Sequence, residues 1–453
     1  MDKSVAILIV GGSGTFGLST AWHLSQAGYT NIQCIDRWPA PSLSSAGYDR
    51  NKASQRRIVR TEYSSPVYTK LAHEAFELWK NPLFKDVFHH TGWIFATDGT
   101  EDLGRRSNFH KCVQNTRNHG DASAMVSLPN WEAAVAKCPV LASHPNHKLH
   151  KEKFEGIYNG NAGWVNSTDA MAVIFRECRR NGVKFASGPA GTASSLLRAD
   201  DGKTVIGVLA EDNTEWLADK IVLATGAYSD TLLDFKSQTQ ACAYVVTHMK
   251  MTEDQYQRYK DNPVLNMLSS SRQEQSQHES LLTLRLGSST DTTYINTVLS
   301  DNPACRWGPI SVPRDKAYHP FDTQPLQGHN LTMNFVKYLL PELKDAEIVS
   351  SKMCWDMECH DYAWLIGAHP DSPNTLFLAT GGSGHSFKNI VHVGKFVMQA
   401  MEDTLDPYYK DMWRWRPDRI GKDPESAERF TRPKYELRDQ VGWKHDRKHM
   451  SKL

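Results

Sequence analysis

The sequence lacks long apolar runs, an excess of charge of either sign, and cysteines at metal-binding spacing. No apolar run approaches the roughly 18 residues of a membrane-spanning helix, so we expect no membrane span. Lysines and arginines number 52 and aspartates and glutamates 51, a formal net charge of +1, and this balance argues against a nucleic-acid partner. The eight cysteines are scattered, which favours reduced intracellular thiols over zinc ligands, so we expect no metal.

The first distinctive feature is a strand, a glycine-rich turn and a helix at the start of the chain. Val5–Val10 is an apolar, largely β-branched run typical of a buried parallel strand. In the G-x-G-x-x-G pattern that follows, we expect Gly12 to form the tight turn, Gly14 to admit a pyrophosphate and Gly17 to let the helix pack on the strand. A second strand, 31–35, ends at an acid that suits ribose hydroxyls. The expected dinucleotide-binding residues are Gly12, Ser13, Gly14, Thr15, Phe16 and Asp36, and FAD and NAD both stay open.

Two later strands are expected in the same sheet. Residues 220–227 form an apolar strand ending in A-T-G, a small-residue turn of the kind that doubly wound sheets return to a cofactor. Residues 375–379 form a strand that leads into a second glycine-rich turn, 381–388, and then a helix. A simple NAD-binding half does not need this turn, whereas a flavin could accept the N–H groups of a helix N-terminus at its anionic edge. The dinucleotide domain is therefore discontinuous, with other sequence inserted within it.

The inserted sequence carries candidate cations and polar tracts. Arg57 and Arg60 lie three residues apart and would point the same way on one helical turn. They form either a solvated basic loop or a site that faces a carboxylate or a flavin. Ser65 and Pro66 predict the N-cap and the first position of a helix. The tract 269–280 has no apolar residue and is predicted to be an exposed loop.

Several motifs, in order along nearly the whole chain, match a known family. They are IVGGSGTFGLSTA, SAGYDRNK, RIVRTEY, TGWIFA, ATGAYSD, a CW pair ten residues before WLI, and GGSGHSFK. With these motifs the chain resembles the monomeric sarcosine oxidase family of flavin amine oxidases, in its fungal branch of fructosyl amino acid, L-saccharopine and L-pipecolate oxidases. Together the motifs are specific to the family, but they do not specify the substrate.

The resemblance implies an α/β fold with two domains. The first is a Rossmann-type FAD-binding domain over residues 1–87, 150–240 and 349–453. The second is a discontinuous antiparallel-sheet (α+β) substrate domain over residues 88–149 and 241–348, which would cover the cofactor. We expect a monomer that takes a small amino-acid substrate and oxygen.

The activity implied by the resemblance is oxidation of the C–N bond of an N-substituted or cyclic amino acid. Oxygen would accept the electrons, and the products would be an imine and hydrogen peroxide. Three alternatives stay open. They are a deglycating fructosyl amino acid oxidase, a flavin dehydrogenase that passes electrons to a partner, and a flavin-holding protein without turnover.

The family's functional residues carry over position by position. The cysteine that holds FAD covalently corresponds to Cys354, and the Arg and Lys that hold the substrate carboxylate correspond to Arg60 and Lys388. Either Arg57 or Lys52 would lie against the flavin. The remaining cofactor contacts implied by the matching motifs are Ala46, Gly47, Phe387 and, again, Lys388.

Three positions depart from the family pattern. Asp356 stands where relatives carry an aromatic two residues after the flavin cysteine. It either pairs with a protein cation or water, or meets a cationic or hydrogen-bond-donating part of the substrate. Gly367 replaces a common acid, and Arg285 aligns with the oxygen-activating lysine, although arginine shares a proton less readily than lysine does. The glutamate of fructosyl amino acid oxidases has no obvious counterpart, which weakens the deglycating alternative.

The two ends of the chain suggest where the protein works. The first apolar segment begins almost at Met1, which leaves no room for a signal peptide. The last three residues, Ser451–Leu453, form the S-K-L address that the peroxisomal import receptor reads, and a basic, charged run precedes them. We therefore expect a peroxisomal protein, in a compartment that suits an enzyme releasing hydrogen peroxide.

Overall fold

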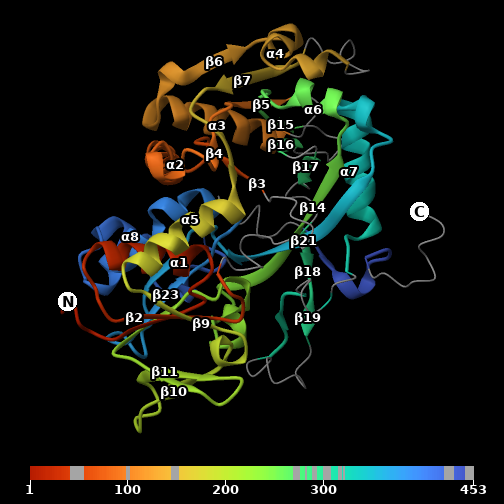
Figure 1. Cartoon of the computed structure of the whole chain (residues 1–453). Helices are drawn as coiled ribbons and strands as arrows, with labels where there is room; N and C mark the ends of the chain where they lie inside the picture. The colour runs from red at the N-terminus through yellow and green to blue at the C-terminus, as the bar shows by residue number, and fades with distance from the viewer. Residues whose placement is uncertain are drawn as a thin grey trace.

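The computed structural model describes residues 1–40, 56–97, 103–143, 153–268, 276–280, 283–287, 293–298, 308–314, 319, 322–422 and 433–443. Four of the expected features, Ala46, Gly47, Lys52 and Ser451–Leu453, lie outside the described residues, as does the side chain of Arg285. Figure 1 shows two regions. In the lower left of the view helices lie along one side of a sheet, and a larger sheet with its own helices extends to the top and right.

The first sheet surrounds the N-terminal strand. Within the described residues it has six strands in the order β22-β23-β13-β1-β2-β9. Neighbouring strands are parallel except for the edge pair β22 and β23, which is antiparallel. The bounds are β1 Ile7–Val10, β2 Ile32–Asp36, β9 Lys184–Ser187, β13 Lys220–Leu223, β22 Leu365–Ala368 and β23 Leu376–Thr380. The strands predicted at both glycine-rich turns and at the A-T-G segment are thus confirmed as members of one sheet.

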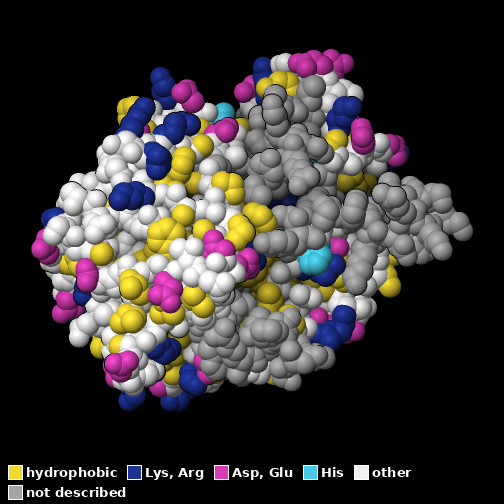
Figure 2. Space-filling view, turned by 60° about the horizontal axis from the view of Figure 1, so that its bottom comes forward, with side chains coloured by type: hydrophobic (Ala, Val, Ile, Leu, Met, Phe, Trp, Pro, Cys, Tyr) yellow, Lys and Arg dark blue, Asp and Glu magenta, His cyan; other side chains and the backbone are white. Residues whose placement is uncertain are grey.

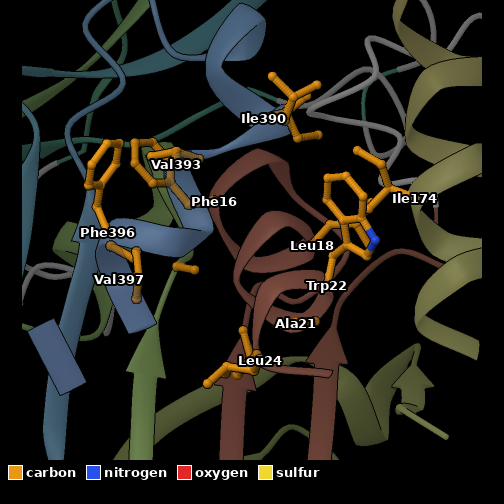
Figure 3. Close-up of a cluster of buried hydrophobic side chains, with 14 of the residues drawn as sticks. Phe16, Leu18, Ala21, Trp22, Leu24, Ile174, Ile390, Val393, Phe396 and Val397 are labelled. Carbon is orange, nitrogen blue, oxygen red and sulfur yellow. The ribbon is translucent and has the colours of Figure 1, made fainter. Parts of the chain in front are cut away.

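Helices pack on one face of the first sheet. They are α1 Thr15–Gln26, α5 Ser167–Arg180 and α8 Val393–Met401. Their contact is apolar and includes Leu18, Trp22, Ile174, Ile390 and Val397 (Figure 3). A Cβ at Gly394 would lie 2.1 Å from Ser19 O, so α8 approaches α1 more closely than any side chain at this position would allow. The predicted helices after the first and the second glycine-rich turns, α1 and α8, are both confirmed.

The opposite face of the first sheet packs against a small three-stranded sheet. Its strands are β10 Ala193–Arg198, β11 Val205–Ala210 and β12 Glu215–Leu217. Next to α8, two further helices complete this region, α2 Pro66–Trp79 and α9 Pro407–Trp413. Ser65 is the N-cap of α2 and a proline occupies its first turn, as predicted.

A second three-stranded sheet carries Arg57. Its strands are β3 Arg56–Val59, β8 Gly163–Asn166 and β4 Phe88–His89. Arg57 pairs with Val165 across β3 and β8, so the helical turn expected for Arg57 and Arg60 is wrong. Four residues are too few for a strand to show its alternation in the sequence, and a spacing of three then reads as helical.

The larger sheet has ten strands among the residues that the structure describes. Its order is β24-β18-β14-β17-β16-β15-β5-β7-β6, with β21 on the other side of β14. The bounds are β5 Trp93–Thr97, β6 Met125–Leu128, β7 Glu155–Asn159, β14 Thr239–Lys250, β15 Val264–Leu268, β16 Ser276–Ser280, β17 Thr283–Gly287, β18 Thr293–Ile295, β21 Ile348–Cys359 and β24 Lys434–Glu436. Pairing is antiparallel except at β5–β15 and β18–β24. We call it the large sheet.

The large sheet has an apolar outer face. The helices packed there are α4 Trp131–Lys137, α6 Glu253–Tyr259 and α7 Leu326–Leu339, while α3 Leu103–His119 contacts β5 from the other face. A two-stranded ribbon, β19 Thr297–Val298 and β20 Ile310–Ser311, completes the described elements. Residues 276–280 form β16, so the exposed loop expected there is wrong for this part of the tract, because a wholly polar strand gives no alternation signal. The domain limits stay a prediction. The segments predicted for the FAD-binding domain include β7 and most of β21, and both strands pair into the large sheet.

The described surface carries charges of both signs. On the face shown in Figure 2, Lys and Arg side chains are interspersed with Asp and Glu side chains. This agrees with a formal net charge of +1 for the whole chain. Among the helices in the described ranges, none has the length and apolar character needed to cross a bilayer.

Candidate functional site

Close backbone contacts shape the first glycine-rich turn. Gly11 has a φ of +83°, so the left-handed position falls on Gly11 and not on Gly12 as expected. A Cβ at Gly12 would lie 2.4 Å from Cys34 Cβ, and one at Gly17 would lie 2.3 Å from Gly11 O. Gly12 therefore serves the packing of β1 on β2, and Gly17 brings α1 against the turn, as predicted.

Asp36 lies against this turn. Its carboxylate is buried, with Oδ2 accepting from Ser13 N–H at 3.1 Å and Oδ1 accepting from Trp38 N–H at 2.9 Å. α1 begins at Thr15, with Gly14 as its N-cap and no side chain capping it. A helix start with uncapped N–H groups beside a carboxylate is the arrangement in which adenine dinucleotides bind.

Asp356 closes the second glycine-rich turn. Gly384 N–H donates to Asp356 Oδ2 at 2.5 Å, and Met357 N–H donates to Oδ1 at 2.9 Å. A Cβ at Gly382 would lie 2.4 Å from Asp356 Oδ1, so a side chain there would displace the carboxylate. Gly384 has a φ of +75°. These partners are backbone N–H groups and not the protein cation or water that was expected, and they give Asp356 a structural role in which its charge holds a tight backbone turn.

Cys354 on β21 meets Arg57 on β3. Arg57 Nη2 donates to Cys354 Sγ at 3.0 Å, while Arg57 Nε is buried and has no partner among the described residues. The guanidinium carbon lies 5.8 Å from the centroid of the Phe387 ring. Burial lowers the pKa of Arg57, and the neighbouring Cys354 and Asp356 raise it by more. A buried guanidinium with an unused donor fits a group rich in acceptors, such as the ring of a flavin.

Arg60 and Lys388 come together at Tyr63. Arg60 Cζ lies 4.5 Å from the centroid of the Tyr63 ring and 5.7 Å from that of Trp93. Lys388 Nζ donates to Tyr63 Oη and, at 3.3 Å, to His385 O. Lys388 is buried in a short 3-10 helix, Phe387–Val391, which separates the glycine-rich turn from α8. The structure therefore brings together the two cations that the resemblance pairs at a carboxylate.

Glu62 and Tyr63 are site residues that the sequence analysis did not single out. Glu62 is buried, and its carboxylate accepts from Thr61 N–H at 3.1 Å and from Asn159 Nδ2 at 2.5 Å. Burial raises the pKa of Glu62, while Asn159 and Arg60 act in the opposite direction. Arg60 also donates to Glu62 O. The R-T-E-Y segment shows an acid two residues after Arg60. Without knowledge of burial, such an acid and arginine are interpreted as a solvent-exposed ion pair.

Arg285 is placed by the register of its strand alone. It lies opposite His248 of β14, which in turn lies opposite Ser350 of β21. Cys354 follows Ser350 by four residues, which is about 13 Å along a strand. Side chains alternate between the two faces of a sheet, so residues four apart, such as Ser350 and Cys354, belong to the same face. Arg285, in register with Ser350 through His248, therefore belongs to the face of Cys354. The oxygen-activating role of Arg285 stays a prediction.

Comparison with known proteins shows similarity to flavin oxidases over nearly the whole chain. The profile of the family described as "DAO: FAD dependent oxidoreductase" matches residues 6–400. L-saccharopine oxidase from Schizosaccharomyces pombe (strain 972) is 31% identical over 430 residues, which cover 92% of this chain and 94% of that protein. The structure of fructosyl peptide oxidase from E. terrenum has a TM-score of 0.87 at 32% identity, covering 99% of this chain and 100% of that one. Fructosamine oxidase from Aspergillus fumigatus (Amadoriase II) has a TM-score of 0.83 at 26% identity, covering 98% of both chains.

Proposed function

The chain belongs to the family of FAD-dependent oxidoreductases, and from this premise we propose that it oxidises the C–N bond of an N-substituted or cyclic amino acid. Its relatives are named as oxidases of amino acids and of fructosyl amines, and we propose oxygen as its electron acceptor. FAD, when bound, supplies the hydride acceptor, and the protein supplies binding and orientation. The products would be an imine and hydrogen peroxide.

One observation carries this proposal. Arg60 and Lys388, from distant parts of the chain, meet at Tyr63 near the hydrogen-bonded pair of Arg57 and Cys354. Two cations at one place hold a carboxylate through charge-assisted hydrogen bonds. Phe387 links the two groups, because it precedes Lys388 and its ring lies 5.8 Å from the Arg57 guanidinium. A carboxylate held by Arg60 and Lys388 would fix the substrate's C–N bond relative to the group that Arg57 faces.

We propose that Cys354 carries the flavin covalently. Its Sγ accepts a hydrogen bond from Arg57, and a neighbouring guanidinium favours the thiolate, which is the reactive form. Cys359 is the nearby alternative. It is buried, and burial raises the pKa of its thiol to about 12, so it stays neutral and unreactive. A Cβ at Gly381 would lie 2.4 Å from Cys359 Sγ, which leaves no space beside it on that side.

Cys354→Ser tests the linkage, with Cys359→Ser as the matched control. After acid precipitation, wild type and Cys359→Ser should stay yellow, and the flavin mass should travel with a peptide containing Cys354. Cys354→Ser should release its flavin on denaturation and lose activity, because a tethered ring is both retained and held in register. Flavin released from the denatured wild type would refute the linkage and leave the oxidase proposal standing.

Oxidation of fructosyl amino acids is the second candidate function. It is favoured by the structural neighbours with TM-scores of 0.87 and 0.83, which are named as oxidases of fructosyl peptides and fructosamines. The relative at 31% identity is named as a saccharopine oxidase. Both kinds of substrate carry a carboxylate, so Arg60 and Lys388 serve either one and do not separate the two candidates.

A substrate panel separates the candidates. It contains N-methyl amino acids, pipecolate, saccharopine and fructosyl amino acids, and hydrogen peroxide is the readout. Peroxide from an N-substituted or cyclic amino acid supports the proposal, and peroxide from the fructosyl compounds alone supports the second candidate. Flavin reduction without peroxide indicates a dehydrogenase that uses a partner, and no reduction by any amine indicates a flavin-holding protein. A colourless protein that uses NAD would contradict the cofactor.

Asp356→Asn distinguishes the two roles left open for this carboxylate. If Asp356 only holds the second glycine-rich turn, all substrates should lose activity by the same factor, because the bond to Gly384 is weakened for all of them. If it also meets the substrate, substrates with cationic or hydrogen-bond-donating groups should lose most. The ranking of the panel in the variant decides between these roles.

We also propose a peroxisomal location and a monomeric state. The support for the location is the S-K-L ending at Ser451–Leu453. Removing these three residues should move the protein to the cytosol and leave its activity unchanged. Continued import after the deletion would contradict the proposal. A particle with the mass of one chain in light scattering would support the monomer.

A further inference from the structure

Glu62 is a buried acid whose carboxylate is held against the large sheet. It lies in the segment after β3, two residues beyond Arg60. Its carboxylate accepts from Asn159 Nδ2 of β7 at 2.5 Å and from the main-chain N–H of Thr61 at 3.1 Å. Glu62 has an exposed fraction of 0%, and Thr61 and Asn159 have 1% each. Because a buried carboxylate is costly unless it is hydrogen-bonded, these bonds fix the segment at one place on the sheet.

Asn159 connects this segment to the part of the large sheet that lies next to Arg60. Its Nδ2 donates to Thr61 Oγ1 at 2.9 Å as well as to Glu62. Asn159 is the last residue of β7 and lies opposite Trp93 of β5. The centroid of the Trp93 ring is 5.7 Å from Arg60 Cζ. The sheet therefore holds the main chain of the segment on one side and contacts the guanidinium on the other.

Arg60 is linked to Glu62 through the main chain and through charge. Arg60 Nη1 donates to Glu62 O, so the guanidinium is oriented by a carbonyl whose position the Glu62 carboxylate fixes. The two charges also attract each other, because Arg60 opposes the rise in the pKa of Glu62 that burial causes. A guanidinium has five N–H donors in a rigid plane, so fixing one of them directs the others.

We propose that Glu62 is a positioning residue of the carboxylate site. Its carboxylate fixes the main-chain oxygen that orients Arg60, and Arg60 in turn binds the substrate carboxylate. A long side chain that is oriented before the ligand arrives loses less conformational entropy on binding, which raises the affinity. The inference rests on the proposed function, because it assumes that Arg60 binds a carboxylate.

The test is a cycle of Glu62→Gln and Arg60→Met, made in proteins of equal flavin content. Glutamine keeps an oxygen for Asn159, but its amide nitrogen is a donor and cannot accept from Thr61 N–H. For the amino acid of the panel that turns over fastest, Glu62→Gln should raise KM about tenfold and change kcat little. The carboxamide of the same substrate should be affected much less. In Arg60→Met, adding Glu62→Gln should change KM no further, because the residue through which Glu62 acts is gone.

The direction of the change separates positioning from simple charge balance. Glu62→Gln removes a negative charge near Arg60, and by charge alone it would tighten the binding of an anion. Acetate, followed by the change in flavin absorbance, should instead bind about tenfold more weakly to Glu62→Gln than to wild type. In Arg60→Met, acetate affinity should be the same with and without Glu62→Gln. Tighter acetate binding to Glu62→Gln would overturn the inference.

Two further variants complete the design. Asn159→Ser removes the donors of β7 and keeps both charges, so it should weaken acetate binding in the same direction, and it serves if Glu62→Gln does not fold. Asp230→Asn is the control at a buried acid elsewhere, which accepts from Thr239 Oγ1 at 2.6 Å. It should leave acetate affinity and the acid-to-amide ratio unchanged.

The outcomes distinguish this inference from the proposed function. Equal losses for acid and amide in Glu62→Gln, losses that add to those of Arg60→Met, or no acetate binding to wild type would each overturn the inference. If wild type oxidises an amine and the losses add, the proposed function stands without it. If wild type oxidises no amine but the acetate cycle shows the expected coupling, the proposed function fails and the role of Glu62 stands.

Discussion

Two arginines, the buried Arg416 and the part-buried Arg57, differ greatly in how many of their hydrogen-bond donors are used. Arg416 forms a two-pronged pair with Asp361, Nε to Oδ2 at 2.6 Å and Nη2 to Oδ1 at 2.7 Å. Its remaining donors go to three main-chain oxygens, Trp364 O, Arg414 O and Ala363 O. Burial lowers the pKa of Arg416, and Asp361, Cys359 and Tyr68 together raise it by more.

Arg57 has fewer partners. It donates to a thiol sulfur, Cys354 Sγ, and its Nε has no partner among the described residues. The nearest carboxylate that acts on it is Asp356, whose two oxygens already accept from Gly384 N–H and Met357 N–H. The comparison teaches that a buried arginine whose donors are all used stabilises the fold, whereas the unused Nε of Arg57 is a donor that a ligand can complete.

The largest effect is expected at the saturated arginine. Arg416→Met should destabilise the protein by about 3–5 kcal/mol, because it leaves Asp361 buried without its counter-ion. The unfolding free energy from denaturant titration measures this. The double variant Arg416→Met/Asp361→Asn is the control, and it should lose less than the sum of the single variants. Additive losses would show that Arg416 and Asp361 are not coupled, and would contradict the structural role given to Arg416.

The next effect is expected at the two cations that meet at Tyr63. Arg60→Met and Lys388→Met should each raise KM or Kd for a carboxylate substrate roughly ten- to a hundredfold, because a charge-assisted hydrogen bond is worth about 1.5–3 kcal/mol. The amide of the same substrate should be affected much less. Lys395→Met, on the exposed side of α8, is the control and should change neither. If acid and amide suffer equally, Arg60 and Lys388 belong with Arg416 as structural cations.

A third prediction uses pH to compare a carboxylate that has an arginine with one that does not. Arg416 lowers the pKa of Asp361 against the raising effect of burial, so the pair is lost only as pH falls below the ordinary value of 3.8. Burial raises the pKa of Asp230 from 3.8 to about 7, with Thr239 as its hydrogen-bond donor at 2.6 Å. Between these two pH values the folded protein holds a proton that the unfolded chain has released.

The pH dependence of stability that comes from Asp230 therefore has the opposite sign to that from Asp361. Stability should fall as pH rises from about 4 to about 7, by at most about 1.4 kcal/mol per pH unit from this group. Asp230→Asn should remove that slope, and melting temperatures at pH 5, 6, 7 and 8 measure it. An identical pH profile in wild type and Asp230→Asn would contradict the raised pKa.

The smallest effect on stability is expected at the unsaturated arginine. Arg57→Met should change the unfolding free energy by less than about 1 kcal/mol, since the variant removes a buried charge together with a single hydrogen bond to sulfur. Proteins of equal flavin content must be compared. The flavin absorbance spectrum should shift in the variant, because the unused donor of Arg57 is expected to face the ring. A loss as large as that of Arg416→Met, with an unchanged spectrum, would make Arg57 structural.

The first sheet and its helices could be predicted from local signals. Apolar runs predicted β1, β13 and β23, and Ser65 with Pro66 predicted the start of α2. The sequence did not predict that Gly11, and not Gly12, takes the left-handed conformation. Part of the reason is a distant contact, because a Cβ at Gly11 would lie 2.4 Å from Ala224 O. That oxygen comes from the residue after β13, more than two hundred residues away along the chain.

The site was predictable only where motifs of the family carried it. The meeting of Arg60 with Lys388 follows from the resemblance, whereas no periodicity or spacing connects the two positions. The partners of Asp356 and of Arg416 were not predictable, because the hydrogen bonds to Gly384 and from Arg416 to Asp361 join segments 28 and 55 residues apart. Glu62 and Tyr63 are sequence neighbours of Arg60, but a sequence does not show that Glu62 is buried or that Tyr63 lies between the two cations.

The order of strands in the first sheet has a consequence for how the protein is made. β1 lies between β2 and β13, with Ile7 opposite Ile32 on one side and Lys220 on the other. At the usual rates of synthesis, the 213 residues between Ile7 and Lys220 take roughly 10–40 s to appear. During that time one edge of β1 has no neighbouring strand. The other edge of β13 stays unpaired until β23 has been synthesised, because Ile221 lies opposite Leu376. The first sheet therefore cannot close around β1 until the middle of the sequence has been synthesised, and it is completed only by the C-terminal third of the chain.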